Sequence, residues 1–216
     1  MERKPKTEIS EKEAKKRFDE LQVLSRIIIK FMKVERATLH ADGRTHENDG
    51  EHTLHAMFLA VAYARKYNPE LDSGRIAELI MVHDLVEVYA GDTVSLTADT
   101  ARMNDKKERE ISALVRLEEE LGDVFPAIIK LIEEYESLNS EEARFAKAFE
   151  KIDPAFTHIA NDGVAFQKMG ITSKRQHDDL FEANIKKTLD YAAPDLVKIR
   201  REGHERARDV TTYQDL

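Results

Sequence analysis

Four ionisable side chains gather in one short stretch of the sequence, His83-Asp84-Leu-Val-Glu87 and its continuation to Asp92. The His83-Asp84 pair follows the apolar run IAELIMV, so this pattern carries two ionisable groups toward the protein interior. Burying such groups without partners is costly. A divalent cation would offset this cost, because it accepts an imidazole nitrogen and a carboxylate oxygen together. A buried ion-paired cluster is the alternative interpretation.

Helical spacing brings the next carboxylates toward the same place. Glu87 stands four residues after His83 and three after Asp84, which puts the three side chains on one side of a helix. Asp92 follows directly after Gly91. The spacing predicts that the four polar groups converge, although Glu87 could also form an ion pair and Asp92 could serve the turn after the glycine.

A second histidine-rich stretch, ENDGEHTLH at 47–55, lies upstream. It places His52 near the start of a predicted helix, with Asn48 or Asp49 as the cap. His55 follows one turn later on the same face, so the pair has the spacing of metal ligands. Either histidine could instead pack in the core or bond a backbone carbonyl, and the periodicity leaves the choice open.

The chain also contains a second His-Asp pair, at His177-Asp178. It lies in the charged stretch SKRQHDDLFE, and we interpret it as solvated helix surface. A His-Asp dipeptide alone is therefore a weak signal, and only the set of spacings carries weight.

Composition limits the class of protein. The 216 residues, 41% of them hydrophobic, are enough for one core, and we expect a single domain over 1–216. Without cysteine, any metal must use nitrogen and oxygen ligands. The net charge of −8 argues against binding a nucleic-acid polymer and favours small phosphate esters held by a local cation. No run is long enough for a membrane span and residues 1–10 lack a secretory signal, so we expect a cytoplasmic location.

Helical periodicity with only 8 glycines and 5 prolines predicts an all-α fold without strands. The first helix should begin at Ser10, with Glu13 completing a capping box. Later helices are expected at about 51–67, 73–90, 101–121, 124–138, 140–152, 173–192 and 194–208. Residues 39–50 are predicted to form a loop and 91–100 an ordered loop. The predicted core stripe of the first helix consists of Phe18, Leu21, Leu24, Ile28, Phe31 and Met32.

Breaker residues set the expected helix ends. Gly91 is predicted to be the left-handed cap of the third helix. Asn139 or Ser140 should cap the sixth, and Pro154 should kink or break it. Pro194 suits the first position of the last helix.

Taken together, Glu51-His52, HDLVE at 83–87 and GD at 91–92 resemble the HD-domain phosphohydrolases, and particularly the branch that contains the 5′-deoxynucleotidases. The resemblance runs from about residue 21 to NDG at 161–163, a metal-site core that the C-terminal helices at 173–208 extend. It implies an HD-domain helical bundle with one divalent metal. The family's histidine and its adjacent His-Asp pair map onto His52, His83 and Asp84.

The fourth family ligand is an aspartate three residues after a lysine. Aligning on RFAKAFE places Glu150 at this position, which departs from the family by one methylene. Glu150 can still coordinate through oxygen. Asp153, one turn along the same face, is the alternative ligand.

The resemblance also implies roles for three other residues. Glu87 and Asp92 would share two tasks, protonating the leaving alkoxide and positioning the attacking water, and the sequence does not assign them individually. Arg36 resembles an arginine near the end of the first helix that contacts the phosphate, although it could simply interact with the helix dipole. Leu39 stands near the position of a tryptophan that bears on sugar recognition in relatives. The acidic set Glu133, Glu134 and Glu136 resembles a substrate-site stretch, but we interpret it as a solvated helix face.

These observations predict a phosphomonoesterase that hydrolyses nucleoside 5′-monophosphates with one divalent ion, which could be Mn, Co, Zn, Fe, Ni or Mg. Because relatives dimerise, we expect a homodimer. One alternative is a regulatory domain that binds metal without turnover. Another is an oxygen-activating enzyme with two irons, which would need His46 or His55 as additional ligands.

Overall fold

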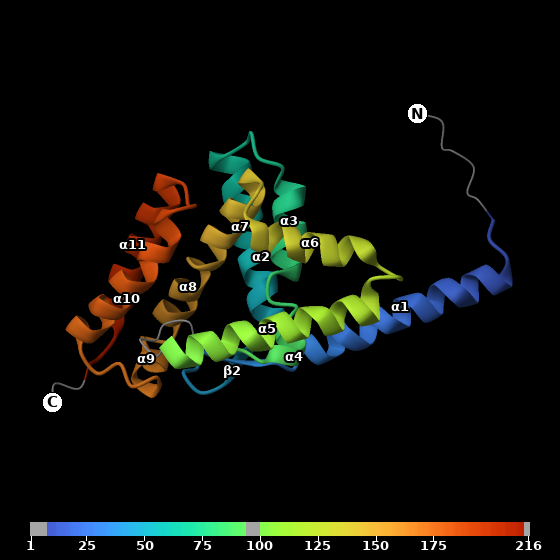
Figure 1. Cartoon of the computed structure of the whole chain (residues 1–216). Coiled ribbons are helices and arrows are strands. Elements are labelled where there is room, and N and C mark those ends of the chain that lie inside the picture. The colour runs from blue at the N-terminus through green and yellow to red at the C-terminus, as the bar shows by residue number, and fades with distance from the viewer. Residues whose placement is uncertain (1–7, 94–99, 214–216) are drawn as a thin grey trace.

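The computed structural model describes the backbone of residues 8–93 and 100–213 and the side chains of 8–93 and 105–213. Helices dominate it, which confirms the expected all-α class (Figure 1). The elements in chain order are α1 Glu11–Phe31, β1 Glu35–Leu39, β2 His46–Asn48, α2 Asp49–Tyr67, α3 Ser73–Val82, α4 Glu87–Ala90, α5 Thr100–Leu121, α6 Pro126–Ser137, α7 Glu141–Glu150, α8 Asp153–Ala160, α9 Val164–Lys168, α10 Lys174–Leu189 and α11 Pro194–Val210.

Side-chain caps fix several helix starts at the predicted places. Ser10 accepts a hydrogen bond from the backbone N–H of Glu13, although the reciprocal half of the predicted capping box is not seen between these described residues. Asn48, rather than Asp49, caps α2 through a reciprocal capping box with Glu51. Ser140 caps α7. These bonds satisfy N–H groups that have no partner inside the helix.

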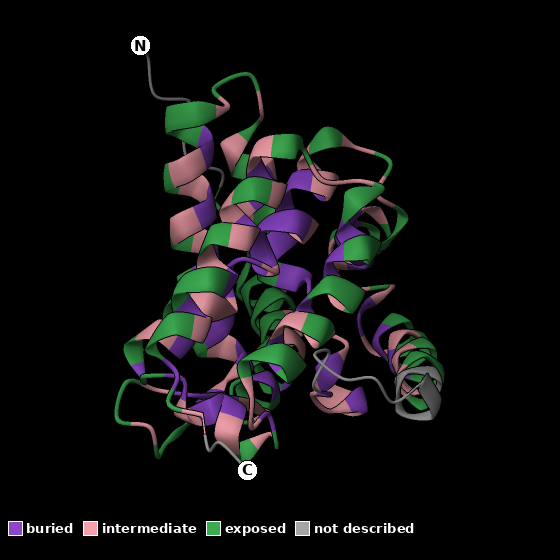
Figure 2. Cartoon of the chain, turned by 90° about the vertical axis from the view of Figure 1, so that its left-hand side faces the viewer, coloured by how far each residue is buried: buried purple, intermediate pink, exposed green. Residues whose placement is uncertain are grey.

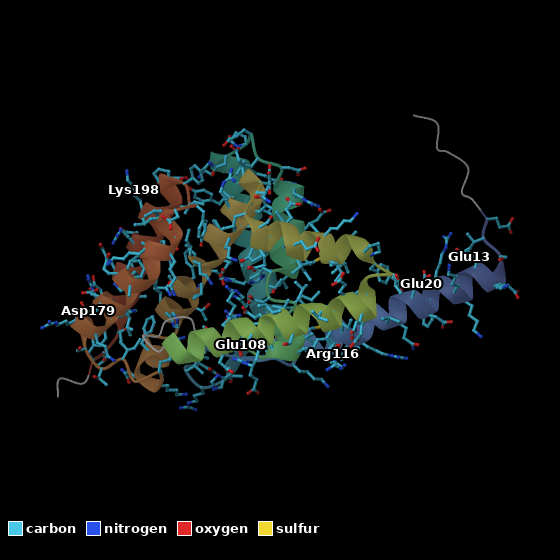
Figure 3. The ribbon with its side chains drawn as sticks, viewed as in Figure 1. Glu13, Glu20, Glu108, Arg116, Asp179 and Lys198 are labelled. Carbon is cyan, nitrogen blue, oxygen red and sulfur yellow. The ribbon has the colours of Figure 1, made fainter. Side chains whose placement is uncertain are left out.

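The main core lies around α3. This helix packs against α2, α6 and α7, and its side chains Ile76, Leu79 and Ile80 are fully buried. Figure 2 shows the buried residues gathered on the inward faces of the helices, with exposed residues outside. In Figure 3 the charged side chains of Glu108 and Lys198 lie on the outside. Burial of the apolar α3 stripe therefore holds the central helices together.

The predicted third helix is interrupted at His83, the first of its candidate metal ligands. α3 ends at Val82, and α4 starts only at Glu87. Between them the backbone N–H groups of His83, Leu85 and Glu87 each bond a carbonyl three residues back, a tighter turn than the α-helix. His83 and Asp84 therefore lie in a turn, and simple helical spacing does not describe their directions.

The prediction that no strands form is wrong, because β1, just before and at the start of the predicted loop at 39–50, and β2 within that loop form a small antiparallel sheet. β1 pairs with β2 so that Glu35 lies opposite Asn48 and Leu39 opposite His46. Leu39 is fully buried, which anchors the pair to the bundle. Arg36 consequently belongs to β1 and not to the end of the first helix, which ends at Phe31.

The predicted core stripe of α1 is largely wrong. Phe18, Leu21 and Met32 are 65%, 56% and 56% exposed, whereas Phe31 is buried. The N-terminal half of α1 extends beyond the other helices, as Figure 1 shows, so its apolar side chains have no described residues to cover them. Amphipathic periodicity identified an apolar face but could not tell whether the same chain covers it.

The outcome at a predicted proline helix end agrees with the expectation, and the outcome at a predicted glycine helix end differs from it. Pro154 lies in the first turn of α8, which starts after α7 ends at Glu150, so of the two predicted outcomes the structure shows the break and not the kink. Gly91 ends α4 with a φ of +72° but a ψ of 151°, outside the left-handed helical turn. Most of the predicted loop at 91–100 lies outside the described residues. The final pair, α10 and α11, confirms the expectation, and the short α9 was not predicted.

Candidate metal centre

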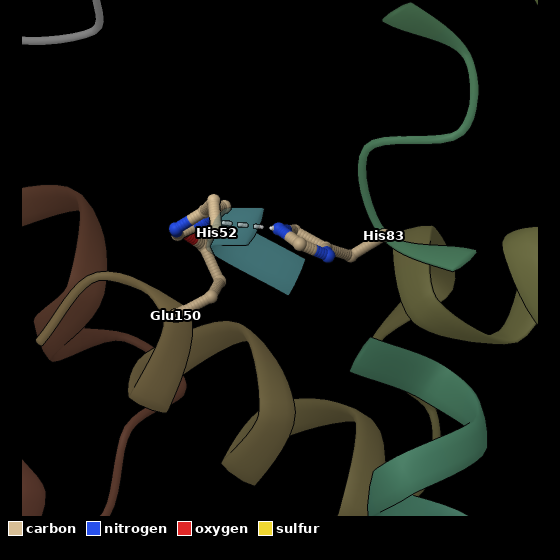
Figure 4. Close-up of side chains that lie close together, drawn as sticks. All are labelled: His52, His83 and Glu150. Carbon is tan, nitrogen blue, oxygen red and sulfur yellow. Dashed lines mark hydrogen bonds between the residues drawn. The ribbon is translucent and has the colours of Figure 1, made fainter. Parts of the chain in front are cut away.

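Three buried side chains from distant parts of the chain converge on one point. His52 near the start of α2, His83 after α3 and Glu150 at the end of α7 each offer a ligand atom, and these atoms lie within 4.8 Å of one another (Figure 4). Asp84 joins them, because its Oδ2 lies 3.0 Å from His83 Nε2 and 3.8 Å from His52 Nε2. The four predicted ligands are thus brought together.

The orientation of the two imidazoles fits a shared cation. His52 Nδ1 faces Asp153 Oδ2 at 2.9 Å, and His83 Nδ1 faces the carbonyl of Ile80 at 2.6 Å. Both partners accept hydrogen bonds, so both Nδ1 atoms donate, and the lone pairs of the neutral rings lie on Nε2. The two Nε2 atoms face each other at 3.3 Å, and two lone pairs there would repel unless a proton or a cation lies between them. A divalent metal bound by nitrogen and oxygen relieves that repulsion.

The electrostatics of the cluster favour positive charge. Burial lowers the pKa of His83, but Asp84 beside it outweighs this effect and the pKa is raised. Burial raises the pKa of Asp84, whereas His83 and Arg36 lower it, and the result lies well below the ordinary value. A carboxylate that stays ionised in a buried site is a suitable ligand for a cation.

Asp153 supports the histidines from behind. Its Oδ2 contacts His52, and its Oδ1 contacts His55 Nδ1 at 2.7 Å, so both oxygens are engaged. The residue is fully buried. Glu150, and not Asp153, offers an oxygen to the cluster. This geometry gives Asp153 the role of holding the His52 ring, while the ligand set itself stays a prediction.

Glu150 is held in place by two neighbours. Tyr135 Oη donates to its Oε1 at 3.1 Å, and Lys151 Nζ lies 2.8 Å from the same oxygen. Burial raises the pKa of Glu150, but Lys151 and His83 outweigh this and lower it. The carboxylate is therefore oriented by Tyr135 and Lys151.

A cluster of three carboxylates lies beside the candidate metal site. Asp49, Asp84 and Glu87 bring oxygens within 4.8 Å of one another. Arg36 Nη1 bridges two of them, at 2.8 Å from Asp84 Oδ2 and 3.1 Å from Asp49 Oδ1. Burial, followed by Asp84, raises the pKa of Asp49 to about 7. The sequence offered Asp49 only as a helix cap, although its place three residues before His52 was a usable signal.

Glu87 and Asp92 reach the same region. Glu87 is 3% exposed, its Oε1 lies 3.4 Å from Lys106 Nζ, and its Oε2 has no hydrogen-bond partner in the described part of the chain. Burial, with Asp84 next in importance, raises the pKa of Glu87 to about 10. Asp92 Oδ2 accepts a hydrogen bond from the N–H of Ala37 at 3.3 Å, which ties it to β1.

A cavity of about 160 Å³ extends from these groups. Its charged end is lined by Arg36, Asp84, Glu87, Lys106, Glu150 and Lys151. Its other lining residues come mainly from α8, α9, α10 and α11 and include His177. The prediction that His177-Asp178 is solvated surface is therefore wrong for His177, which is 1% exposed. Packing of α10 on α11 buries that face, which local charge density cannot reveal.

Other sequence candidates lie elsewhere. His46 is exposed, and its Nδ1 faces the carbonyl of Arg36, so the two histidines weighed as additional iron ligands, His46 and His55, both lie outside the cluster. Glu133 and Glu136 are exposed and Glu134 pairs with Arg75, which agrees with a solvated helix face.

Comparison with known proteins identifies the family. Residues 29–209 match the model of the HD domain family. A crystal structure from Magnetospirillum magnetotacticum MS-1, described as a predicted metal-dependent phosphohydrolase, is similar with a TM-score of 0.70 and 26% identity over 91% of this chain and 98% of that chain. A structure from Pyrococcus horikoshii, at 18% identity and a TM-score of 0.51 over 91% and 99% of the two chains, supports the fold alone.

Two curated relatives are similar over shorter stretches. The 5′-deoxynucleotidase HDDC2 of Mus musculus is 31% identical over 46% of this chain and 49% of its own length. A 5′-deoxynucleotidase of Enterobacter sp. (strain 638) is 35% identical over 44% of this chain and 53% of its own length. The chain thus spans about half the length of the curated relatives it matches. Within the described residues, no helix is both long enough and apolar enough to cross a membrane.

Proposed function

The chain belongs to the HD domain family, and from this premise we propose that it is a metal-dependent phosphomonoesterase that hydrolyses nucleoside 5′-monophosphates. The observation that carries the proposal is that the His52, His83 and Glu150 cluster adjoins a cavity whose charged end contains both carboxylates and cations. The relatives described as 5′-deoxynucleotidases support a nucleotide substrate.

In this proposal His52, His83, Asp84 and Glu150 hold one divalent ion. Imidazole nitrogens and carboxylate oxygens suit Mn, Co, Zn, Fe, Ni or, less well, Mg. When bound, such an ion supplies Lewis-acid chemistry, lowering the pKa of water and withdrawing charge from phosphoryl oxygens. Asp153 and the Ile80 carbonyl keep both Nε2 atoms turned toward the site.

Positive side chains at the same end of the cavity would bind the phosphate. Arg36 presents a planar fork of donors, which suits a phosphate group. Lys106 and Lys151 also line this end. In a protein with a net charge of −8, these local cations offset the unfavourable overall field for an anionic substrate.

The two carboxyl groups divide the proton transfers. We assign Glu87 as the donor to the leaving 5′ oxygen, because it is buried, lines the cavity and has an unpartnered Oε2 among the described residues. Its raised pKa keeps it protonated near neutral pH. Asp92, held by the N–H of Ala37, is assigned to orient the attacking water. As the water oxygen bonds to phosphorus, the P–O5′ bond breaks, the Glu87 proton passes to O5′ and one proton of the water passes to Asp92. Proton exchange with solvent then restores both carboxyl groups after nucleoside and inorganic phosphate leave.

Phosphate release tests the proposal. Chelator-stripped protein is reconstituted separately with manganese, cobalt, zinc or magnesium and offered ribo- and deoxyribonucleoside 5′-monophosphates. We expect metal-restored release that is lost in Asp84→Ala, with Glu133→Ala on the solvated helix face as the control. Phosphate release that persists in Asp84→Ala contradicts the proposal. So does the absence of phosphate release from every nucleotide although metal is bound. The absence of phosphate release from every nucleotide would favour the non-catalytic alternative.

We also propose that the active form is a homodimer. The exposed apolar side chains of α1, among them Leu21 and Ile29, support an association surface, because such contiguous faces are uncommon on monomers. Light scattering after size exclusion should give twice the chain mass. Leu21→Glu with Ile29→Glu should then give the single chain mass, and a monomeric parent protein would contradict the proposal.

A further inference from the structure

Five aromatic rings in mutual contact line the part of the cavity that α8, α9, α10 and α11 form. Ring centroids lie 4.0 Å apart for His158 and Phe166, 4.1 Å for Phe166 and His177, and 4.6 Å for His177 and His204. Phe181 stacks on His204 at 3.9 Å with an interplanar angle of 7°. Five rings from α8, α9, α10 and α11 thus form one continuous wall, and all five line the cavity.

The polar atoms of this wall are not equally satisfied. His177 Nδ1 pairs with Tyr213 Oη at 2.7 Å, and His204 Nε2 pairs with Asp178 Oδ1 at 2.8 Å. His158 differs, because its side chain is buried at 7% exposure and its Nδ1 has no hydrogen-bond partner among the described residues. A buried polar atom without a partner is costly, so this atom marks a place for a ligand group.

We propose that this wall is the subsite for the base of the substrate nucleotide, with His158 as a recognition residue. The inference rests on the proposed function and extends it, because it assigns the ring-lined part of the cavity to the base and the part lined by Arg36, Lys106 and Lys151 to the phosphate. His158 and Arg36 line the same cavity, so one ligand can reach both. The volume of about 160 Å³ far exceeds the roughly 10–15 Å³ that one water needs on the same measure.

The chemistry of the wall selects a planar heteroaromatic group. Faces of phenyl and imidazole rings favour stacking with another flat π-system. A base also carries ring nitrogens and exocyclic groups that can pair with His158, whereas an aliphatic leaving group would leave Nδ1 without a partner. Arg200 on α11 adds a donor-rich group whose guanidinium bonds the neutral side chains of Thr188 and Asn184. This favours bases with a carbonyl acceptor.

Nucleoside binding tests the subsite independently of catalysis. Calorimetry with adenosine, guanosine, cytidine and thymidine, which lack phosphate, measures affinity for the full chain. Met169→Trp fills the cavity from a half-buried position, and His158→Phe keeps the ring but removes its nitrogens. Met32→Trp, an identical change at a residue 56% exposed beside α1, is the matched control. Circular dichroism checks that each variant is folded.

We expect at least about tenfold weaker nucleoside binding in Met169→Trp, a severalfold loss in His158→Phe and no change in Met32→Trp. Ribose 5-phosphate, which lacks a base, should bind all four proteins equally. Undetectable nucleoside binding to the parent protein at millimolar concentration, or unchanged affinity in both folded cavity variants, overturns the subsite.

The same proteins separate this inference from the proposed function. Metal-restored hydrolysis of nucleotides and ribose 5-phosphate at equal kcat/KM would retain the phosphomonoesterase and overturn the base subsite. Nucleoside binding that responds to the variants as expected, without hydrolysis of any ester, would retain the subsite and contradict the proposed function.

Discussion

The two Nε2 atoms of His52 and His83 lie 3.3 Å apart because their other ring nitrogens are fixed by acceptors. Asp153 fixes one ring and the Ile80 carbonyl fixes the other. Asp153 and the Ile80 carbonyl therefore orient the two imidazole rings without belonging to the candidate metal cluster themselves. Glu150 completes the cluster from α7, and its own position depends on Tyr135 and Lys151.

Substitutions at Glu150 should separate a ligand from a structural carboxylate. We expect Glu150→Gln to weaken divalent-metal binding at least about tenfold, because an amide oxygen carries no charge. Glu150→Asp introduces the aspartate that the family has at this position, and it should lose less metal affinity than Glu150→Gln. Competition with a chromophoric chelator measures both affinities. Wild-type affinity in Glu150→Gln would exclude this residue as a ligand.

Asp153→Asn tests the support behind His52. Loss of the carboxylate that holds His52 Nδ1 should weaken metal binding by roughly 10–100-fold, as is usual when a group that orients a ligand is removed. Cobalt absorption provides the readout that separates the roles. The band shape should survive in Asp153→Asn and change in Glu150→Gln, whereas the reverse result would make Asp153 the ligand.

The turn between α8 and α9 illustrates how elements constrain one another. Gly163 has a φ of +70°, and a β-carbon there would lie 1.8 Å from Thr211 Oγ1 and 2.9 Å from Thr211 Cα. Thr211 itself is buried, at the end of α11, where its hydroxyl donates to the Ala207 carbonyl. The approach of α11 to this turn therefore requires glycine for both conformation and space.

Gly163→Ala should lower the free energy of unfolding by about 2–5 kcal/mol, the sum of a left-handed backbone and overpacking. Gly170→Ala is the matched control, because Gly170 has a φ of +80° but no described atom within 4 Å of the place that an alanine methyl group would take. It should cost only about 1–2 kcal/mol. Urea unfolding measures the free energy of unfolding of both variants. Equal losses would show that Thr211 moves aside at little energetic cost.

At the scale of the whole molecule, the buried histidines of the cavity wall make the stability of the protein depend on pH. Burial, with His177 next in importance, lowers the pKa of His158 to about 3. Burial, with His204 next, lowers the pKa of His177 to about 4. Histidine in the unfolded chain has a pKa of about 6.5. The unfolded state thus binds more protons below that value, and the free energy of unfolding falls as the pH falls from about 6.5 toward about 4.

His158→Phe should reduce this pH dependence. Between pH 7 and pH 5 the stability loss should be smaller than in the parent protein by about 2 kcal/mol, the linkage from one histidine over 1.5 pH units. Phe166→Leu perturbs the same wall without removing a titrating group and should keep the full loss. Urea unfolding in chelator at both pH values gives the comparison, and an unchanged loss in His158→Phe would contradict the assigned pKa.

The sequence by itself determined the helical class and most helix bounds, and it predicted the residues of the candidate metal cluster. Local signals carried this information, since Ser140 and Asn48 act as caps within a few residues and His83-Asp84 follows an apolar run. The family resemblance placed Glu150 at the fourth ligand position, although the choice between it and Asp153 required knowing which oxygens were already engaged.

Only the tertiary structure decided which faces are covered. The apolar stripe of α1 is exposed at Phe18 and Leu21, and the charged stretch around His177 contributes a fully buried ring. Arg36 reaches Asp84 because β1 pairs with β2, an arrangement that neither segment predicts alone. Burial and long-range pairing depend on the packing of elements distant in sequence, so local periodicity and charge density cannot determine them.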